Sequence, residues 1–395
     1  MVWGGWSWQP EWGVGGGLVS KIRTGIYGYG KVAHTHAWAL NTLPQSEFVA
    51  VCGRNLERAR EFAQQYGASA HDDVEEMVAR ADVQAVVVCT PHPAHALPAI
   101  QSMQAGAHVL MEKPLAASLH DCDAMLATAR EAGVKLAVVS QRRLYEPVQR
   151  VKAAIDAGKI GLPILGTAVI LGWRDEAYYT SDPWRGRWDR EGGGILVNQA
   201  PHQLDLLQWF MGSIDELYGY WDNLNHPYIE VEDTAVAVLR FKNGALGSIV
   251  VSNSQKPGIY GKVHVHGANG ASVGVQTDGG PMFVSGMSEV REPPINDLWT
   301  VPDEERLLSS WQENDRRGFA AIDATRHYHR LQVQDFLQAI QEDRAPLVTG
   351  DEGRVTVEIF TAIYRAQRDR APVKFPVSAV GDADDFDGRL WRPPA

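Results

Sequence analysis

The chain has 395 residues, a formal net charge of −11 at pH 7, and a composition that is 45% hydrophobic and 22% charged. This length predicts two domains, because a single domain usually spans roughly 100–200 residues. The acidic balance without a basic stripe argues against nucleic acid or an anionic membrane as a partner, and no apolar run is long enough for a transmembrane helix.

The two ends of the chain are predicted to lie outside the folded domains, and the cysteines indicate the compartment. Four of the 13 tryptophans fall in the first twelve residues, a segment without periodicity and without the regions of a signal peptide. We predict an arm over residues 1–20 that covers its own substrate domain or a neighbouring subunit, and a loosely held tail over residues 381–395. The three scattered cysteines form neither a disulfide framework nor a zinc pattern, so we expect a cytoplasmic protein with no metal site.

Strands and helices alternate over residues 21–145, which predicts a doubly wound α/β domain. A continuous apolar run such as Ala85–Cys89 is typical of a strand buried on both faces of a parallel sheet. The predicted strands are Ile22–Tyr27, Phe48–Cys52, Ala85–Cys89, His108–Met111 and Leu136–Val139. The predicted helices run to about Leu43 and then cover Glu57–Tyr66, Val74–Arg80, Ala94–Ala105 and His120–Ala132.

The pattern changes over residues 146–380, where we predict an α+β domain on a mostly antiparallel sheet. Turn sequences at 242–244 and 268–270 separate strand-like runs, as expected for antiparallel connections. The predicted strands are Ile164–Leu171, Ala235–Phe241, Leu246–Ser252, Lys262–His266 and Ser272–Gln276. The predicted helices are Pro147–Ala157, a stretch after Gly194 that reaches Met211, Tyr328–Gln341 and Asp351–Gln367.

Gly28, Gly30 and Ala33 form a Gly-x-Gly-x-x-Ala pattern between the first strand and the helix that follows. A dinucleotide pyrophosphate needs a tight turn and a close backbone approach, and it binds at a helix N-terminus where N–H groups point at it. Glycine permits both, and a small third residue lets the helix pack on the sheet. The pattern predicts a dinucleotide site, with a glycine turn that binds nothing as the alternative.

The end of the second strand bears on the choice of cofactor. An acid there accepts hydrogen bonds from the free ribose hydroxyl of NAD, whereas an arginine accommodates the additional phosphate of NADP. The chain has Arg54 and no acid at this point, which slightly favours NADP as the predicted cofactor. Stacking of Arg54 on the adenine of either cofactor is the alternative.

Two polar sequences follow the next strands, at the edge where open α/β sheets bind ligands. Thr90-Pro91-His92-Pro93-Ala94-His95 follows one strand and Glu112-Lys113-Pro114 follows the next. A lysine at such a strand end can point into the cleft and protonate a substrate oxygen. An ordinary Glu–Lys surface pair is the alternative.

A glycine-rich sequence, Gly192-Gly193-Gly194, precedes a stretch that carries Asn198, His202 and Asp205. In a continuous helix these three polar residues share one face, which suits an active site better than a core. Pro201 argues against a regular helix throughout.

Together these motifs resemble the Gfo/Idh/MocA family of NAD(P)-dependent oxidoreductases over about residues 21–375. The matching sequences are Gly28 to Ala33, Thr90-Pro91 with His95, Ala105 to Pro114, Gly192 to Asp205, and Tyr328 to Phe336 with Arg344-Ala345-Pro346. The resemblance implies a Rossmann dinucleotide-binding domain over 21–145 and a substrate-binding and oligomerisation domain over 146–380. Its open sheet commonly builds dimers or tetramers, so we expect a homodimer or homotetramer.

The resemblance also implies site residues. Lys113 and His202 would form the catalytic pair, with Asn198 standing where family members often carry aspartate. Because an amide cannot take a proton, His202 becomes the general base and Lys113 stabilises the developing alkoxide. The expected cofactor-binding residues are Gly28, Tyr29, Gly30, Lys31, Val32, Arg54, Thr90, Pro91, His92, His95, Glu112 and Lys113.

The expected substrate is a cyclic sugar, glycoside or polyol that is oxidised at a secondary hydroxyl. Trp184 and Arg185 suit a carbohydrate, because an aromatic ring packs on C–H groups and arginine binds hydroxyls; Asn198 and His202 complete this expected substrate site. A purely structural aromatic loop is the alternative. Two other functions stay open at this point: a redox glycosidase that oxidises its substrate transiently, and a cofactor-binding regulator without catalysis.

Overall fold

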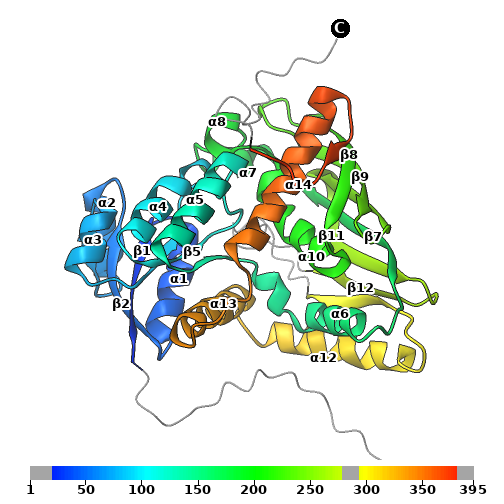
Figure 1. Cartoon of the computed structure of the whole chain (residues 1–395), viewed down its shortest axis with the longest axis horizontal. Coiled ribbons are helices and arrows are strands. Elements are labelled where there is room, and N and C mark those ends of the chain that lie inside the picture. Colours follow the sequence, from blue (N-terminus) through cyan, green and yellow to red (C-terminus); the bar gives the residue numbers. More distant parts are fainter. Residues whose placement is uncertain (1–19, 278–292, 380–395) are drawn as a thin grey trace, which may run out of the picture.

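The computed structural model describes residues 20–277 and 293–379 (Figure 1). The predicted tail over 381–395, and the predicted arm apart from Ser20, lie outside the described residues. None of the described helices combines the length and the apolar character needed to span a membrane. The three cysteines are free and buried.

A six-stranded parallel sheet forms the N-terminal half of the molecule, in the order β3-β2-β1-β4-β5-β6. Its strands are β1 (Ile22–Tyr27), β2 (Ser46–Cys52), β3 (Ser69–His71), β4 (Ala85–Val88), β5 (His108–Met111) and β6 (Leu136–Val138). Its helices are α1 (Lys31–Thr42), α2 (Leu56–Gln64), α3 (Val74–Arg80), α4 (Ala96–Gln104) and α5 (Leu119–Ala132). The strand order reverses between β1 and β4, which is where such sheets bind ligands. The predicted Rossmann arrangement is confirmed.

An eight-stranded sheet forms the C-terminal half, in the order β13-β12-β11-β7-β10-β9-β8-β14. Its strands are β7 (Pro163–Trp173), β8 (Ile214–Asp222), β9 (Thr234–Phe241), β10 (Leu246–Ser252), β11 (Ser254–Gly267), β12 (Ser272–Gln276), β13 (Ile295–Trp299) and β14 (Val373–Lys374). Only the β7–β10 pair is parallel among these described strands. The two predicted turns join β9 to β10 and β11 to β12, so the mostly antiparallel sheet is confirmed.

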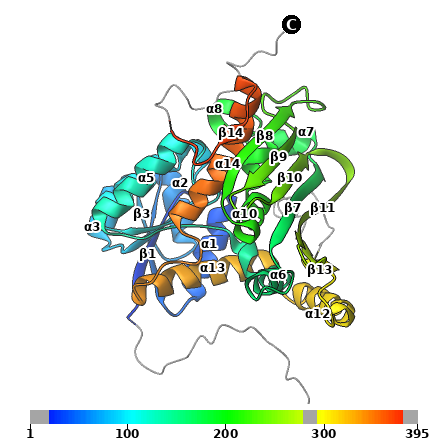
Figure 2. The same cartoon turned by 45° about the vertical axis from the view of Figure 1, so that its right-hand side comes forward.

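Further helices connect the two sheets or pack on them, and the helices over residues 146–156, 201–211 and 350–369 contact strands of the second sheet (Figure 2). They are η2 (Gln141–Leu144), α6 (Glu146–Asp156), α7 (Glu176–Thr180), α8 (Trp188–Glu191), α9 (Ile195–Asn198), α10 (Pro201–Met211), α12 (Leu308–Ala320), α13 (Ala324–Gln341) and α14 (Gly350–Asp369); two further short turns are η1 (His92–Ala94) and η3 (Glu305–Leu307). The stretch predicted to run to Met211 is broken between α9 and α10. Pro201 starts α10, where its missing N–H costs nothing, rather than continuing α9.

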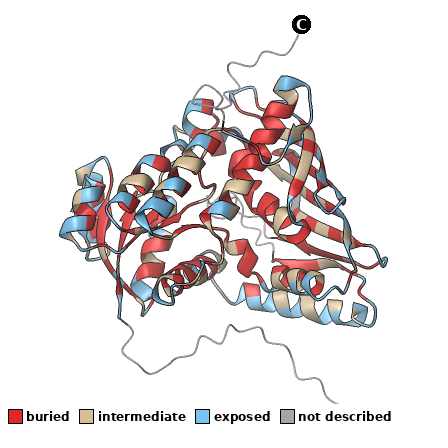
Figure 3. Cartoon of the chain, in the orientation of Figure 1, coloured by how far each residue is buried: buried red, intermediate tan, exposed pale blue. Residues whose placement is uncertain are grey.

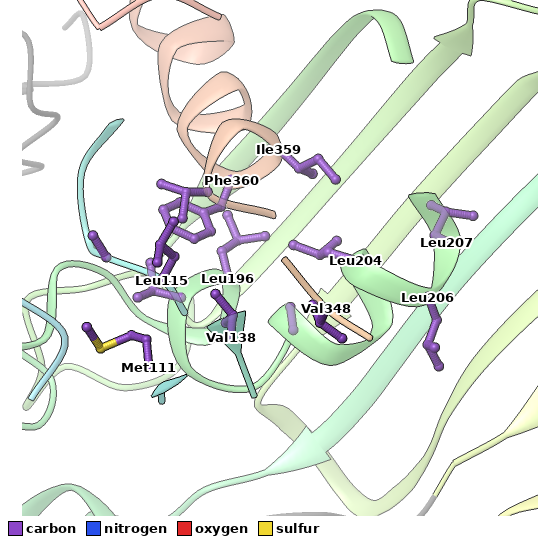
Figure 4. Packing of buried hydrophobic residues seen from close by; sticks show 14 of the residues in the cluster. Met111, Leu115, Val138, Leu196, Leu204, Leu206, Leu207, Val348, Ile359 and Phe360 are labelled. Carbon is purple, nitrogen blue, oxygen red and sulfur yellow. The ribbon is translucent and has the colours of Figure 1, made fainter. Parts of the chain in front are cut away.

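The core is continuous across the two halves. Figure 4 shows Met111, Leu115 and Val138 from the parallel-sheet half beside Leu196 and Phe360 from the other half, and all five belong to one buried cluster. Figure 3 shows buried residues concentrated along α14 and α10, where the halves meet. The two halves are therefore joined by a shared hydrophobic core.

Helix α13 returns the chain to the parallel-sheet half. It packs against α1, and its residues Val333, Phe336 and Leu337 share a buried cluster with Ile26 and Leu40. Figure 1 shows α13 beside α1, below the first sheet. The parallel-sheet half is thus completed by a helix that lies far along the chain.

The second face of the eight-stranded sheet is left open by the described residues. From Ala235 to Phe241, strand β9 alternates strictly between buried and exposed side chains. Its exposed Val236 and Val238 lie 45% and 60% exposed on the same face as Tyr220 of β8 and Leu246 of β10. This apolar face, defined by Leu165, Tyr220, Val236, Val238 and Leu246, is called the open sheet face below.

Candidate active site

The glycine loop after β1 leaves room for a ligand at the start of α1. Gly28 has a φ of +111°, and a Cβ there would lie 2.8 Å from the carbonyl oxygen of Cys89, so glycine is required. Gly30 is the N-cap of α1, no side chain caps this helix end, and a Cβ on Gly30 would meet nothing within 4 Å. The protein itself does not need glycine at position 30. An anionic group that approaches the first turn of α1 does, so the loop fits a pyrophosphate.

Tyr29 turns from this loop toward the end of β2. A Cβ on Gly53 would lie 2.4 Å from the Tyr29 ring, so the ring packs directly on this glycine. The Tyr29 hydroxyl accepts a hydrogen bond from the Asn55 N–H at 3.2 Å, and the Arg58 guanidinium lies 4.8 Å from the ring centroid. Tyr29 therefore joins the loop to the place where a cofactor ribose is expected.

Both basic and acidic side chains lie near the end of β2, where the cofactor ribose is expected. Arg54 is exposed at the end of β2. Asp72 and Asp73 follow β3, whose His71 pairs with Cys52, and they lie close enough to add to burial in raising the pKa of the Cys52 thiol to about 12. The fold thus brings acids beside a strand end whose own sequence has none.

The loop after β4 is held by its histidines. The buried His95 ring has Nδ1 3.0 Å from the carbonyl oxygen of Pro114 and Nε2 2.9 Å from that of Thr90. His92 donates from Nδ1 to the carbonyl oxygen of Glu191 at 3.1 Å, and burial lowers the pKa of both histidines. These contacts tie the loop to its neighbours, while the predicted cofactor contacts of Thr90, Pro91, His92 and His95 stay predictions.

Glu112 is buried beneath the lysine and held ionised. His36 of α1 donates from Nε2 to Glu112 Oε1 at 2.7 Å, and His329 of α13 lies 3.9 Å from the same oxygen. Burial raises the pKa of Glu112, but the hydrogen bond from His36 and the nearby charges of His329 and Lys113 outweigh it and bring the pKa to about 2. One nitrogen or oxygen atom from each of the His36, Glu112 and His329 side chains lies within 4.8 Å of those of the other two.

Lys113 crosses from the parallel-sheet half to the other half. Its Nζ donates to the backbone oxygen of Asn198 at 2.8 Å, and its own N–H donates to Glu112 Oε2 at 3.1 Å. Burial lowers the pKa of Lys113 to about 8, with Glu112 and Glu191 opposing the shift and Arg142 and Arg185 adding to it. A lysine with such a pKa can both donate and accept a proton near neutral pH.

His202 lies on the first turn of α10 and is 6% exposed. Burial, followed by the charges of Arg142 and Lys113, lowers the pKa of His202 well below its usual range. The imidazole is therefore neutral at pH 7 and able to accept a proton. The structure brings His202 and Lys113 into one electrostatic site, although they come from different halves.

Asn198 lies at the centre of a buried hydrogen-bond network. Its Nδ2 donates to Glu191 Oε1 and, at 3.3 Å, to the Tyr178 hydroxyl. The same hydroxyl accepts from Gln199 Nε2 at 3.0 Å and from Arg185 at 2.5 Å. Asn198, His202 and Lys113 are brought together as predicted from the motifs, but across a break between two helices rather than along one face.

The aromatic loop reaches the same place. The Arg185 guanidinium lies 4.4 Å from the Trp184 ring and 4.3 Å from the Tyr178 ring. Trp184 contacts the His92 ring at 5.7 Å between centroids, so the loop touches the strand ends of the parallel sheet. Lys31 at the start of α1 lies 3.5 Å from Asp182 of this loop. The expected substrate residues and the expected cofactor residues therefore face each other.

Asp205 has a different role from the one that its spacing suggested. It accepts hydrogen bonds from Ser140 Oγ at 2.6 Å and from Arg143 Nε and Nη2 at 2.8 and 2.6 Å. Arg143 is fully buried and also pairs with Glu352 of α14 at 2.6 Å. Asp205 therefore anchors α10 to the parallel-sheet half.

Sequence reasoning missed three residues of this site: Glu191, His36 and His329. His36 could have been found, because it interrupts the buried face of α1 formed by Ala33, Ala37 and Leu40. Glu191 had no such signal, since it lies in a short polar helix beside Asp189 and Arg190.

The fold and the site define a dinucleotide-dependent oxidoreductase: a glycine loop lies at the strand-order reversal, and a half-buried lysine and a buried histidine meet where the two halves join. Residues 22–140 match the oxidoreductase family with an NAD-binding Rossmann fold, and residues 148–273 match the GFO/IDH/MocA C-terminal domain. The chain belongs to the Gfo/Idh/MocA family.

Similar proteins cover nearly the whole chain. The WlbA dehydrogenase of Bordetella pertussis, solved with NADH and UDP-GlcNAcA, is 31% identical with a TM-score of 0.76, covering 91% of this chain and all of that one. The myo-inositol 2-dehydrogenase of Thermotoga maritima is 27% identical over 89% of this chain and 98% of its own length. The scyllo-inositol 2-dehydrogenase (NAD(+)) of Bacillus subtilis is 24% identical over 90% and 97%.

Proposed function

We propose that this oxidoreductase is an NAD(P)-dependent dehydrogenase that oxidises a secondary hydroxyl of a cyclic polyol, sugar or glycoside. The observation that carries the proposal is that Lys113 from the parallel-sheet half meets Asn198 and His202 from the other half. The inositol dehydrogenases and the sugar-nucleotide-bound dehydrogenase among its relatives support the substrate class.

The cofactor fits the residues present. The uncapped start of α1 and the open space at Gly30 suit the pyrophosphate, and the bound nicotinamide supplies the acceptor for a hydride. Arg54 supports the slight lean to NADP, whereas Asp72 and Asp73 beside Cys52 oppose an added phosphate. Both cofactors therefore belong in the assay.

His202 and Lys113 divide the proton chemistry. The neutral His202 imidazole accepts the hydroxyl proton, and Lys113 in its ammonium form stabilises the alkoxide-like charge that develops. The cationic neighbours that lower the pKa of His202 also favour prompt release of that proton. In this scheme Trp184 and Arg185 hold the sugar ring, with the aromatic face against C–H groups.

The open sheet face supports a homodimer or homotetramer, because an apolar patch of this kind on a monomer is a liability in water. The cytoplasmic location predicted from the cysteines is kept as part of the proposal; all three are free and buried.

The test follows reduced nicotinamide with NAD⁺ and NADP⁺ in parallel across inositols, hexoses and aryl glycosides, and also measures aglycone release. We expect net cofactor reduction with at least one cyclic substrate. We expect His202→Ala to lower kcat about 100-fold or more, while His327→Ala, a histidine on α13 outside the site, leaves kcat within about twofold. Aglycone release without net reduction, or cofactor binding with no turnover on the panel, would contradict the proposal.

A further inference from the structure

Glu191 is a buried carboxylate that the proposed chemistry does not use. It ends α8 and is 1% exposed. Its Oε2 accepts the Gly186 N–H at 2.5 Å, and its Oε1 accepts Asn198 Nδ2. Both oxygens therefore act as acceptors of hydrogen bonds from groups that can only donate.

This arrangement favours an ionised carboxylate. An amide in its place would turn its N–H₂ group toward one of the two donors, and a protonated carboxyl group would offer one of them its hydroxyl oxygen, which is a weaker acceptor. A buried N–H without a good acceptor costs free energy. Neutralising the Glu191 carboxylate therefore also disrupts one of its two hydrogen bonds.

The hydrogen bonds of Asn198 determine which way its amide points. Nδ2 is committed to Glu191 and to the Tyr178 hydroxyl, whereas Oδ1 forms no hydrogen bond within the described residues. The backbone oxygen of the same residue holds Lys113 Nζ at 2.8 Å. Asn198 thus presents an acceptor on one side and anchors the lysine on the other.

The charges around Glu191 connect it to the same lysine. Lys113 and Arg185 are the cations that act on Glu191, and Glu191 in turn opposes the lowering of the Lys113 pKa. The remaining titratable groups that feel its charge are Tyr178, Tyr179 and Tyr364.

We propose that Glu191 is a positioning residue for the oxidation: it holds Asn198 so that Oδ1 accepts a hydrogen bond from a substrate hydroxyl, and its charge favours the ammonium form of Lys113, which the backbone oxygen of Asn198 holds. This inference rests on the proposed function. Glu191 does not touch the reacting atoms itself; it acts through Asn198 and Lys113.

The Glu191 carboxyl group changes its protonation state near neutral pH. Burial raises the pKa of Glu191 to about 7, against the hydrogen bonds from Gly186 and Asn198 and the charges of Arg185 and Lys113. Below this pH the carboxyl group takes up a proton and one of its two hydrogen bonds is disrupted. Activity is therefore expected to fall on the acid side with an apparent pKa of about 7.

The decisive variants exchange the acid and the amide. In Glu191→Gln one of the two donors loses its acceptor. In the double variant Glu191→Gln with Asn198→Asp, the new amide donates to the new carboxylate and still accepts the Gly186 N–H, so both hydrogen bonds of residue 191 are restored. The bond to Tyr178 is kept only with its direction reversed, because the hydroxyl now donates to the carboxylate. Glu232→Gln is the matched control, because Glu232 is equally buried with a pKa of about 7 but bonds Gly194, Leu196 and Tyr364 instead.

We expect Glu191→Gln to lower kcat/KM about tenfold or more. In the profile of kcat/KM against pH, the fall on the acid side near pH 7 disappears, and the fall on the basic side moves to lower pH. The double variant recovers most of kcat/KM, and its activity again falls on the acid side of the pH profile. The control Glu232→Gln keeps the wild-type pH profile on both sides. An unchanged pH profile in Glu191→Gln, or a double variant no better than the single one, overturns the proposal.

A second measurement does not depend on turnover. The pH dependence of Lys113 labelling by an amine-reactive acylating reagent, read by mass spectrometry, reports its pKa in each folded variant. We expect Glu191→Gln to label Lys113 at lower pH than the wild type. The same labelling curve in both proteins refutes the role of Glu191 even if the substrate panel is inactive, and a shifted curve without any turnover refutes only the proposed function.

Discussion

The buried ion pair between Arg143 and Asp205 leads to a strong prediction about stability. Arg143 is fully buried, Asp205 is 4% exposed, and two N–H groups of the guanidinium bond the carboxylate. Removing one partner of such a pair costs about 3–5 kcal/mol, because the remaining charge stays buried. In Asp205→Asn, Arg143 keeps Glu352 as a counter-ion, so we expect a loss near the lower end, about 3 kcal/mol of unfolding free energy.

Urea unfolding without cofactor, followed by both tryptophan fluorescence and circular dichroism, measures this loss. Coincident transitions are needed before a free energy is extracted. Asp351→Asn is the matched control, since the Arg130–Asp351 pair has side chains that are 67% and 66% exposed and such pairs contribute about 0–1 kcal/mol. A loss below about 1 kcal/mol in Asp205→Asn would refute the claim that this pair joins the halves.

Four further predictions concern the site and the surfaces. Gly30→Val leaves the circular dichroism spectrum unchanged, because its Cβ meets nothing within 4 Å, but weakens cofactor binding about tenfold or more in a fluorescence titration. Lys113→Met lowers kcat roughly 100-fold and abolishes the basic limb, which the wild type shows near pH 8 as the ammonium is lost. Burial raises the pKa of Glu232 from 4.5 to about 7, so its contribution to stability is present below pH 4.5 and is lost as the pH rises through 7. In urea unfolding, the wild type loses on the order of 3 kcal/mol relative to Glu232→Gln between pH 5 and pH 8, and a constant difference between the two proteins would contradict this. Val238→Glu on the open sheet face reduces the size of the assembly in gel filtration, whereas Leu97→Glu on α4, which is 68% exposed, does not; equal elution of both variants would argue against this interface.

The sequence predicted most of the fold because its signals are local. The apolar residues of β4 are all buried, and the turns around Gly244 and Gly270 join antiparallel neighbours as their composition indicates. Elements without such signals were missed. Strand β8 carries acids at Asp215 and Glu216 that obscure its alternation, and α12 buries only Phe319, so it shows no apolar stripe.

The site was predictable where chemistry follows a motif and unpredictable where it follows from packing. Lys113 and His202 were named from their sequence contexts, and the structure places them in one site. Glu191 belongs to that site only because the turn at Gly186 and the break after Asn198 meet in space. No periodicity or spacing encodes that meeting, so only the tertiary structure shows it.

The return of α13 to the parallel sheet has a consequence for biosynthesis. The ribosome releases the six strands of the parallel sheet first, yet Val333, Phe336 and Leu337, which close the core beside Ile26 and Leu40, emerge much later. Until then the apolar side of α1 lacks its cover, and an incomplete sheet domain exposes surface that promotes aggregation. A fragment that ends after the last parallel strand is therefore a poor unit for separate expression, and the nascent chain has to wait for its C-terminal third before either half is finished.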